Sequence, residues 1–281
     1  MMKHKIWSRL YLTIVFILLY IPIFYLVFYS FNEGGTMNEF TGFTWEHYQS
    51  VFEDTRLLII VLDTFFLAFL SALIATIIGT FGAMGIYYTK KRRMRNIFMS
   101  LNNILLVSPD VIIGASFLIF FTTLGGFIRN FNLGFTSVLL SHIAFSIPIV
   151  VLMVLPKLRE MNDSMVDAAL DLGANYFQVI QRIILPFLSP GIIAGYFMAF
   201  TYSLDDFAVT FFVTGNGFST LSVEIYSRAR QGISLEINAL STLVFLFSMI
   251  LVIGYYFISK DNVPKKLRKG KIATRGVAQI R

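Results

Sequence analysis

Six mostly apolar stretches divide this chain, and each is long enough as a helix to cross a membrane. A hydrocarbon core of about 30 Å needs about 20 apolar helical residues. Windows of that length with few charges predict six transmembrane helices in an all-α membrane protein. The windows run over residues 10–31, 57–88, 97–122, 133–155, 187–213 and 238–258.

The composition agrees with this prediction. Of the 281 residues, 56% are hydrophobic and only 14% are charged, which is too apolar for a soluble domain of this length. The net charge of +7 does not indicate nucleic-acid binding, because the basic residues stand beside the apolar windows rather than along one face. Anchoring to anionic lipid explains that placement more simply. We therefore expect a multi-pass protein of the cell membrane.

The basic residues also predict an orientation, because Lys and Arg beside a span tend to stay on the cytoplasmic side. The first outer connector is acidic, and the connector between the third and fourth windows has only Arg129. Both termini are therefore expected in the cytoplasm. The basic clusters lie before the first window, between the second and third, and after the last: Lys3, Lys5, Arg9; Lys90, Lys91, Arg92, Arg93, Arg95; Lys265, Lys266, Arg268, Lys269, Lys271.

This placement suggests one domain with short ends. Residues 1–9 form a cytoplasmic N-terminus, residues 10–259 the six-helix domain, and residues 260–281 a basic cytoplasmic tail. The first apolar window is longer than the apolar part of a signal peptide, so we expect it to be retained as the first span.

Residues 157–186, between the fourth and fifth windows, contain the most specific pattern outside the spans. Ser164 and Asp167 fit a capping box that starts a helix, and Gly173 fits the residue that ends it. Asn175 with Gln178 then caps a second, amphipathic helix. We expect that helix to turn Phe177, Ile180 and Ile184 toward the membrane and to end in a turn at Pro186.

The spacing in this loop is an acid followed by Ala-Ala, three residues, Gly, nine residues and Ile-x-Leu-Pro. It resembles the signature loop of binding-protein-dependent ABC importer permeases, which contacts the ATPase subunit. The first position in that family is usually Glu, and Asp167 keeps its charge here. A helix that only lies on the lipid is the alternative. The resemblance assigns ATPase coupling to Asp167, Ala168, Ala169, Gly173, Ile183, Leu185 and Pro186.

The similarity extends to Ser108-Pro109-Asp110, Ser203-Leu204-Asp205-Asp206 and other short runs along nearly the whole chain. These runs resemble PotC-type permeases of spermidine/putrescine ABC importers. The resemblance implies the type I (MetI-like) importer fold, with a family core of about residues 60–258. It also implies a second permease, two ATPase subunits and an extracytoplasmic polyamine-binding protein as partners. No G-x-x-x-x-G-K-[ST] motif occurs, in agreement with ATP and Mg²⁺ bound by a partner and no cofactor in this chain.

Four acids lie in or near apolar windows: Asp63, Asp110, Asp205 and Asp206. A carboxylate in a span costs about 2.5–3.5 kcal/mol, so each is a functional candidate, with capping or packing as the alternative. Polyamines are cations, and we expect Asp110, Asp205 or Asp206 to line their path. Adjacent helical residues point about 100° apart, so only one of Asp205 and Asp206 can face a path squarely.

Aromatic rings near these acids are candidates for cation–π contacts. Tyr202 and Phe211 are the rings we assign to the path, although any one ring in so aromatic a chain is more often a packing residue. His142 is expected to be a hydrogen-bonded interior residue. The three histidines share no ligand spacing and the chain has no cysteine, so the sequence predicts no metal site.

These observations lead to one functional expectation and three alternatives. We expect a permease subunit that moves polyamines by alternating access and is not itself an enzyme. An ABC permease for another solute, such as ferric ion or an aminophosphonate, would share the loop but differ along the path. A proton-coupled secondary transporter would use the intramembrane acids as a relay. A membrane scaffold without transport activity would give the acids no substrate role.

Overall fold

The computed structural model describes residues 2–127, 131–231 and 234–261. That part of the chain is helical, and its only β pairing is an isolated antiparallel bridge between Asn32 and Phe43. Arg129 and the predicted tail from residue 262 onward lie outside the described residues. The elements are α1 (Met2–Tyr29), α2 (Glu46–Glu53), α3 (Thr55–Tyr88), α4 (Arg92–Val107), α5 (Asp110–Phe127), α6 (Phe135–Glu160), α7 (Ser164–Asp171), α8 (Tyr176–Val179), the π-helix η1 (Ile180–Ile184), α9 (Leu185–Asp205), α10 (Ala208–Val213), α11 (Leu221–Gln231) and α12 (Leu235–Asp261).

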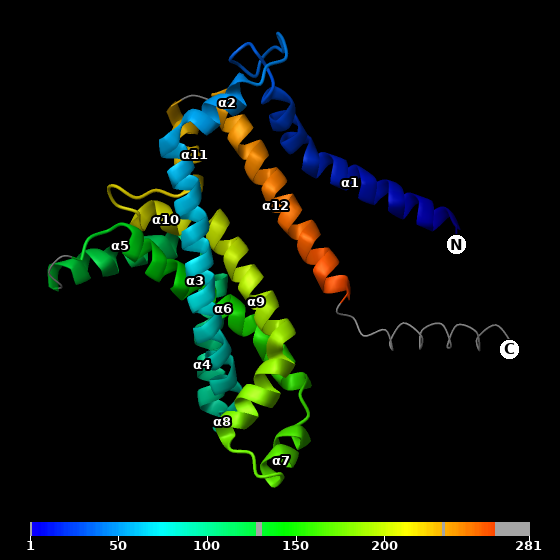
Figure 1. The fold of residues 1–281 in the computed structure, drawn as a ribbon, viewed down its shortest axis with the longest axis vertical. Coiled ribbons are helices and arrows are strands. Elements are labelled where there is room, and N and C mark those ends of the chain that lie inside the picture. Colours follow the sequence, from blue (N-terminus) through cyan, green and yellow to red (C-terminus); the bar gives the residue numbers. More distant parts are fainter. Residues whose placement is uncertain (1, 128–130, 232–233, 262–281) are drawn as a thin grey trace. The chain divides into compact units, whose positions relative to one another are not determined.

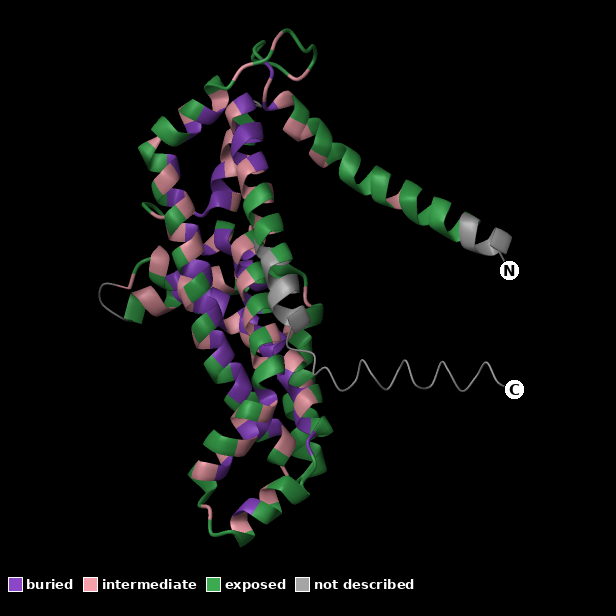
Figure 2. Ribbon diagram, turned by 45° about the vertical axis from the view of Figure 1, so that its right-hand side comes forward, coloured by how far each residue is buried: buried purple, intermediate pink, exposed green. Residues whose placement is uncertain are grey.

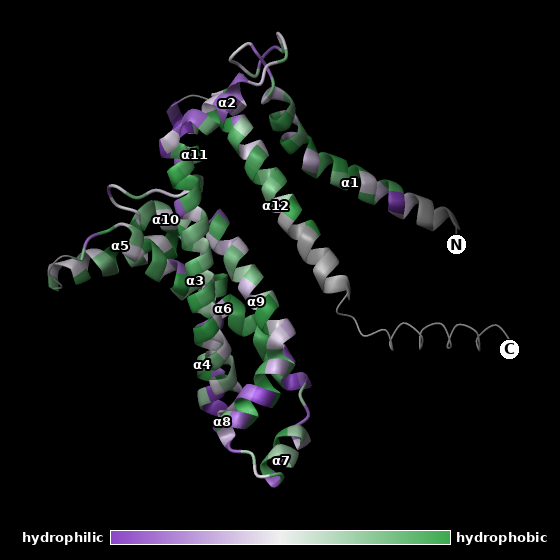
Figure 3. Cartoon of the chain, viewed as in Figure 1, coloured by the Kyte–Doolittle hydropathy of each residue, from purple (hydrophilic) through white to green (hydrophobic). Residues whose placement is uncertain are grey.

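The predicted membrane spans are confirmed in number. Five helices are long and apolar enough to cross a membrane: the part of α1 from Trp7 on, α3, α5, α6 and the continuous helix of residues 176–205. The sixth is α12, which is apolar from Leu235 to Ile250. Figure 3 shows that hydrophobic residues dominate α3, α5, α6 and α9, while hydrophilic residues gather around α8 and the α6–α7 connection.

Two predicted windows are wrong in that they are not single helices. Window 97–122 is divided, because α4 ends at Val107 and α5 begins at Asp110. Ser108 has the extended conformation that a following proline favours, with φ −69° and ψ 139°. Window 187–213 is divided at Asp206, whose ψ of 121° separates α9 from α10. Hydropathy alone does not register such breaks, because apolar residues continue on both sides.

The chain forms two compact units, one of residues 55–227 and one of residues 1–54 with 228–281. In the first unit α3, α6 and α9 lie side by side, α5 runs beside α10, and α7 and α8 lie at one end (Figure 1). In the second unit α2 and α1 contact α12. The side chains of α1 from Trp7 to Tyr29 are all exposed or half-buried, as its green ribbon shows in Figure 2.

Small residues bring α3, α6 and α9 together. A Cβ added to Gly79 of α3 would lie 2.7 Å from the Val150 Cβ of α6, and one added to Gly195 of α9 would lie 3.3 Å from Val150 Cγ1. Ala72, Ala83 and Val150 are fully buried in the same core. Glycine and alanine at such contacts let membrane helices approach closely.

The expected turn at Pro186 is wrong. Residues 176–205 form one uninterrupted helix, in which Pro186 is within the first two residues of α9 and the five residues of η1 come immediately before. Proline has no N–H to donate to the preceding turn. A π-helical turn is one of the local adjustments by which a membrane helix accommodates a proline.

Candidate functional site

The break between α9 and α10 is organised by Asp206. Its carboxylate Oδ2 accepts hydrogen bonds of 2.8 Å from both the backbone N–H and the hydroxyl of Thr210, and Oδ1 accepts one of 3.3 Å from the Val209 N–H. The side chain is only 6% exposed. The carboxylate therefore satisfies free amides at the start of α10, as an N-terminal capping acid does.

A buried polar network continues from this cap. His142 of α6 is fully buried, with its Nδ1 2.6 Å from the Ser203 Oγ and its Nε2 2.8 Å from the Thr210 Oγ1. The same Nε2 lies 3.5 Å from Asp206 Oδ2, and the Ser203 hydroxyl is also 2.9 Å from that of Ser71 in α3. The prediction that His142 is a hydrogen-bonded interior residue is confirmed. The network joins α3, α6, α9 and α10 inside the bundle.

Asp205 and Asp206 have different surroundings. Asp205, the last residue of α9, is exposed, whereas Asp206 is nearly enclosed by its partners. The roughly 100° between adjacent helical positions leads to this difference. Asp205 is therefore the one of the two whose carboxylate is open to a solute.

Asp110 lies within reach of the same helix. It is the first residue of α5, and its exposed Oδ1 accepts a 2.9 Å hydrogen bond from the hydroxyl of Tyr202 in α9. The Tyr202 ring packs edge-on against Phe145 of α6, with ring centroids 5.0 Å apart. Asp63, in contrast, is half-buried on α3 and belongs to neither group.

Phe211 belongs to an aromatic cluster at α10. Its ring centroid lies 5.4 Å from that of Phe207 and 5.9 Å from that of Tyr226 in α11, and the latter two lie 4.5 Å apart. Phe211 is exposed and Phe207 is half-buried. The sequence-predicted residues thus divide into an exposed set with Asp110, Tyr202, Asp205 and Phe211, and a buried one with Asp206.

The loop after α6 has the predicted helix–glycine–helix form. Gly173 follows α7 with a φ of +84°, the left-handed conformation that favours glycine. Asn175 and Gln178 form the expected capping box, each side chain accepting a 2.9 Å bond from the other's backbone N–H. The capping box predicted for Ser164 and Asp167 is wrong: Asn162 Oδ1 accepts the Ser164 N–H instead, at 3.1 Å, and Asp167 only stands in the first turn.

The faces of this loop differ from those predicted. Asp167, Ala168 and Gly173 are exposed, but Ala169 is buried against the chain's own core, so the small residues do not form one outward face. Ile183 also packs on the core, whereas Leu185 is half-buried and Pro186 exposed.

Three large side chains that the pattern did not single out for docking point outward. Leu172 is 89% exposed, Tyr176 76% and Phe177 71%, while Ile184 is buried and Ile180 packs on the core. The prediction that Phe177 and Ile184 share one membrane-facing side is therefore wrong. We call Leu172, Tyr176 and Phe177 the outer apolar patch. Large apolar side chains exposed outside the membrane-spanning helices are candidates for an interaction surface.

The loop lies at the same end of its unit as a basic cluster. The Tyr87 hydroxyl, near the end of α3, donates a 3.3 Å hydrogen bond to Asp163, just before α7. The end of α3, just before the lysines and arginines of the α3–α4 connection, is therefore bonded to the residue that precedes α7. The sequence assigns the basic α3–α4 connection to the cytoplasmic side.

Comparison with known proteins gives concordant matches. Residues 75–269 match the family described as "Binding-protein-dependent transport system inner membrane component". The chain is 36% identical over 252 residues, 90% of its length and 93% of the relative's, to the spermidine/putrescine transport system permease protein PotC of Escherichia coli K12. It is 33% identical over 272 residues, 96% of each chain, to the putrescine transport system permease protein PotI of the same strain.

A solved structure has the same fold. It is that of a bacterial ABC transporter involved in the import of alginate, with a TM-score of 0.73, 18% identity and coverage of 92% of this chain and 96% of that one. The likeness extends the match from the family region to nearly the whole chain. With its apolar spans, its family match and its relatives in agreement, this chain belongs to the inner membrane components of binding-protein-dependent transport systems, and is a multi-pass ABC importer permease rather than an enzyme.

Proposed function

We propose that this permease imports polyamines, spermidine or putrescine, through alternating access driven by separate ATPase subunits. The observation that carries the proposal is the 36% identity to a spermidine/putrescine permease over 90% of the chain. The second relative, a putrescine permease, supports the same substrate class. Polyamines are flexible cations, so their path requires acidic groups and aromatic faces.

The exposed acids fit this requirement. Asp110 and Asp205 present carboxylates to a solute, with Tyr202 bonded to the first and located three residues before the second. A protonated amine can replace Tyr202 as the hydrogen-bond donor to Asp110 and gains the attraction of opposite charges. Phe211 adds a ring face for the methylene chain or the charge. Asp206 acts on the path indirectly, by holding the break after Asp205 in place.

The remaining partners follow from the type of importer. We infer a second permease, two ATPase subunits that bind ATP and Mg²⁺, and an extracytoplasmic binding protein that delivers the polyamine. A related alginate transporter has been solved in complex with a substrate-bound periplasmic protein, and its TM-score to this chain is 0.69. The outer apolar patch, with Asp167, Ala168 and Gly173 beside it, is the surface we assign to the ATPase, and both chain termini to the cytoplasm.

Uptake of labelled spermidine and putrescine tests the substrate class. Cells that lack this gene are compared with the same cells carrying it on a plasmid, and unlabelled polyamines, ferric ion and an aminophosphonate serve as competitors. Restored uptake that only polyamines compete supports the proposal. Unchanged polyamine uptake removes polyamine as the cargo. Uptake that persists without ATP and collapses with the proton gradient would favour the secondary-transport alternative.

A further inference from the structure

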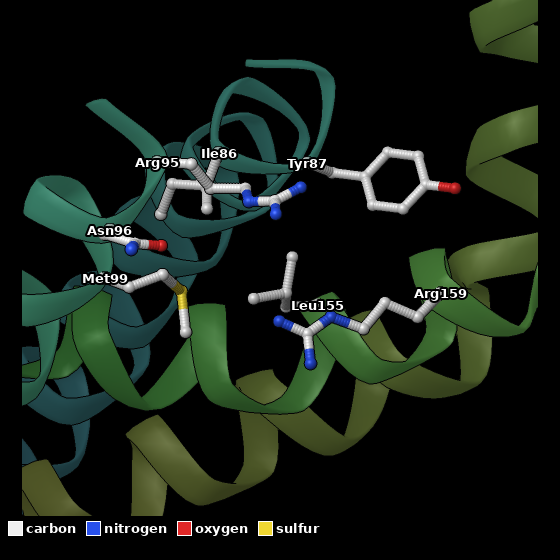
Figure 4. A pocket seen from close by; sticks show the side chains of 7 residues that line it. All are labelled: Ile86, Tyr87, Arg95, Asn96, Met99, Leu155 and Arg159. Atoms are coloured by element: carbon white, nitrogen blue, oxygen red, sulfur yellow. The ribbon is translucent and has the colours of Figure 1, made fainter. Parts of the chain in front are cut away.

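A pocket of about 510 Å³ opens between the end of α3, the first turns of α4 and the last turn of α6. Figure 4 shows the guanidinium groups of Arg95 and Arg159 in this pocket, with Leu155 between them in that view. Tyr87 and Asn96 complete the polar part of its lining. Two arginines from different helices thus approach one cavity outside the proposed substrate path.

The charge of these arginines is not balanced within the described part of the chain, where neither forms an ion pair. The nearest acids along the sequence do not pair with them: Glu160 forms an ion pair with Lys157 at 2.6 Å, and Asp163 accepts the Tyr87 hydroxyl at 3.3 Å but no bond from either arginine. Like charges that share a cavity repel unless an anion joins them. Planar guanidinium groups match the geometry of phosphate, to which they can bind through two hydrogen bonds each.

The rest of the lining is apolar and continues along the helices. Ile86, Met99 and Leu155 line the same pocket. A second cavity of about 100 Å³ shares Met99, Leu155 and Arg159 and extends between α4 and α6 to Val151 and Leu152, with the amides of Asn102 and Asn103 also in its lining. Val151 and Leu152 lie farther from the arginine end of α6. The adjoining cavities are therefore cationic at the helix ends and offer an apolar wall on α6 deeper in the span.

We propose that this cavity binds an anionic membrane phospholipid, with its phosphate between Arg95 and Arg159 and an acyl chain along Leu155, Leu152 and Val151. The shared chemistry is a phosphate group, which a free phosphate ion could also supply. The apolar continuation favours the lipid, because a free ion leaves that half of the cavity without a partner. Basic pockets between transmembrane helices at a membrane surface are typical lipid headgroup sites.

Lipid binding here also affects the loop of residues 157–186, which we call the coupling loop. Tyr87 lines the pocket and bonds to Asp163, immediately before α7. An occupied pocket therefore stabilises the position of α7. The proposal does not depend on the transported solute, so its test needs no uptake measurement and can fail independently of the polyamine assignment.

The test uses the assembled transporter in nanodiscs of phosphatidylcholine, with phosphatidylglycerol added in one arm and inorganic phosphate in another. Phosphatidylglycerol retained after purification is counted by mass spectrometry, and the midpoint of thermal unfolding is measured in each arm. The variants are Arg95→Gln, Arg159→Gln and the double substitution. The matched control, Arg92→Gln with Arg93→Gln, removes the same charge from exposed positions of α4 outside the pocket.

We expect roughly tenfold weaker phosphatidylglycerol retention for each pocket arginine removed, and a larger loss for both, because each removal loses a hydrogen bond between charged groups. The control removes only general attraction to the membrane surface, so its loss should be clearly smaller, and only phosphatidylglycerol should raise the unfolding midpoint. An equal loss in the control would mean general surface attraction and would overturn the site. Stabilisation by inorganic phosphate alone would overturn the lipid as its ligand. If the double variant does not assemble, each single variant and the three arms on the unchanged protein still decide between these outcomes.

Discussion

The hydroxyl of Tyr202 on α9 donates a 2.9 Å hydrogen bond to the carboxylate of Asp110, the first residue of α5. This bond joins the two apolar segments of the permease that are each divided into two helices. Each residue stands near a break, Asp110 after Ser108-Pro109 and Tyr202 before Asp206. The bond therefore ties two helix ends whose separation would open the space between them. A cation that takes the place of the hydroxyl would release that tie.

Removing the charge of Asp110 should slow transport. We expect Asp110→Asn to reduce the maximal rate of spermidine uptake about tenfold, the effect of losing roughly 1.4 kcal/mol with a charged partner. The half-saturating concentration should change little, because the binding protein captures the solute. Uptake kinetics measure both, and Glu46→Gln, an exposed acid of α2, is the control. An Asp110→Asn rate equal to that of the control would exclude Asp110 from the path.

The two adjacent acids should respond differently to the same substitution. Asp206→Asn should lower the free energy of unfolding by about 1–3 kcal/mol, because an amide nitrogen replaces one carboxylate oxygen and cannot accept the bonds that this oxygen receives from Thr210 or from Val209. Asp205→Asn should leave stability unchanged and slow uptake, since its carboxylate is exposed. Thermal unfolding and uptake of the two purified, reconstituted variants separate these effects. Equal destabilisation by both would contradict the assignment.

Gly173 should tolerate one substitution and not another. Gly173→Leu should uncouple ATP hydrolysis from uptake, because a leucine strains the φ of +84° and adds bulk on the surface we propose for the ATPase. No neighbouring atom lies within 4 Å of an added Cβ, so a clash inside the chain is not the cause. Gly173→Asn is the control, as asparagine adopts the left-handed conformation readily. Normal coupled uptake in Gly173→Leu refutes the role of this glycine.

The contact between α3 and α6 at Gly79 should show compensation. Gly79→Ala should destabilise the permease by about 1–3 kcal/mol, since its Cβ would meet Val150 at 2.7 Å. Val150→Ala in the same chain removes the Cγ1 that would lie 2.8 Å from the new Cβ but keeps the Val150 Cβ, so it should recover only part of that loss. The free energies of unfolding of the two single variants and the double variant give the coupling. Additive changes in the free energy of unfolding would show that α3 and α6 move apart, so that the added methyl group does not contact Val150.

Much of this architecture is predictable from local sequence, and its failures have physical causes. Apolar windows give the spans because lipid requires about 20 apolar residues whatever the neighbours are. They do not give the break at Asp206, which depends on a cap formed with Thr210 and on His142 from another helix. The break at Pro109 is indicated by the proline itself, but the apolar window continues across it.

The coupling loop shows the same division. Gly173 and the pair Asn175–Gln178 were predicted correctly because glycine conformation and capping are local. The inward positions of Ala169 and Ile184 were missed, because the packing of the loop against α3, α6 and α9 decides them. The start of α7 at Ser164 was predicted correctly, but its cap was misassigned because Asn162, two residues before Ser164, accepts the Ser164 N–H.

The π-helical turn before Pro186 keeps the helix continuous, so a small movement at the proposed ATPase surface would reach its far end. Because residues 176–205 form one unbroken helix, the outer apolar patch and Asp205 lie at opposite ends of a rod about 45 Å long, at 1.5 Å per residue. A tilt of about one degree about one end displaces the other by roughly 0.8 Å, from the same rise per residue. A tilt of a few degrees is then enough to break the hydrogen bond between Tyr202 and Asp110. The displacement needed to open the proposed path is therefore no larger than the length of a side chain.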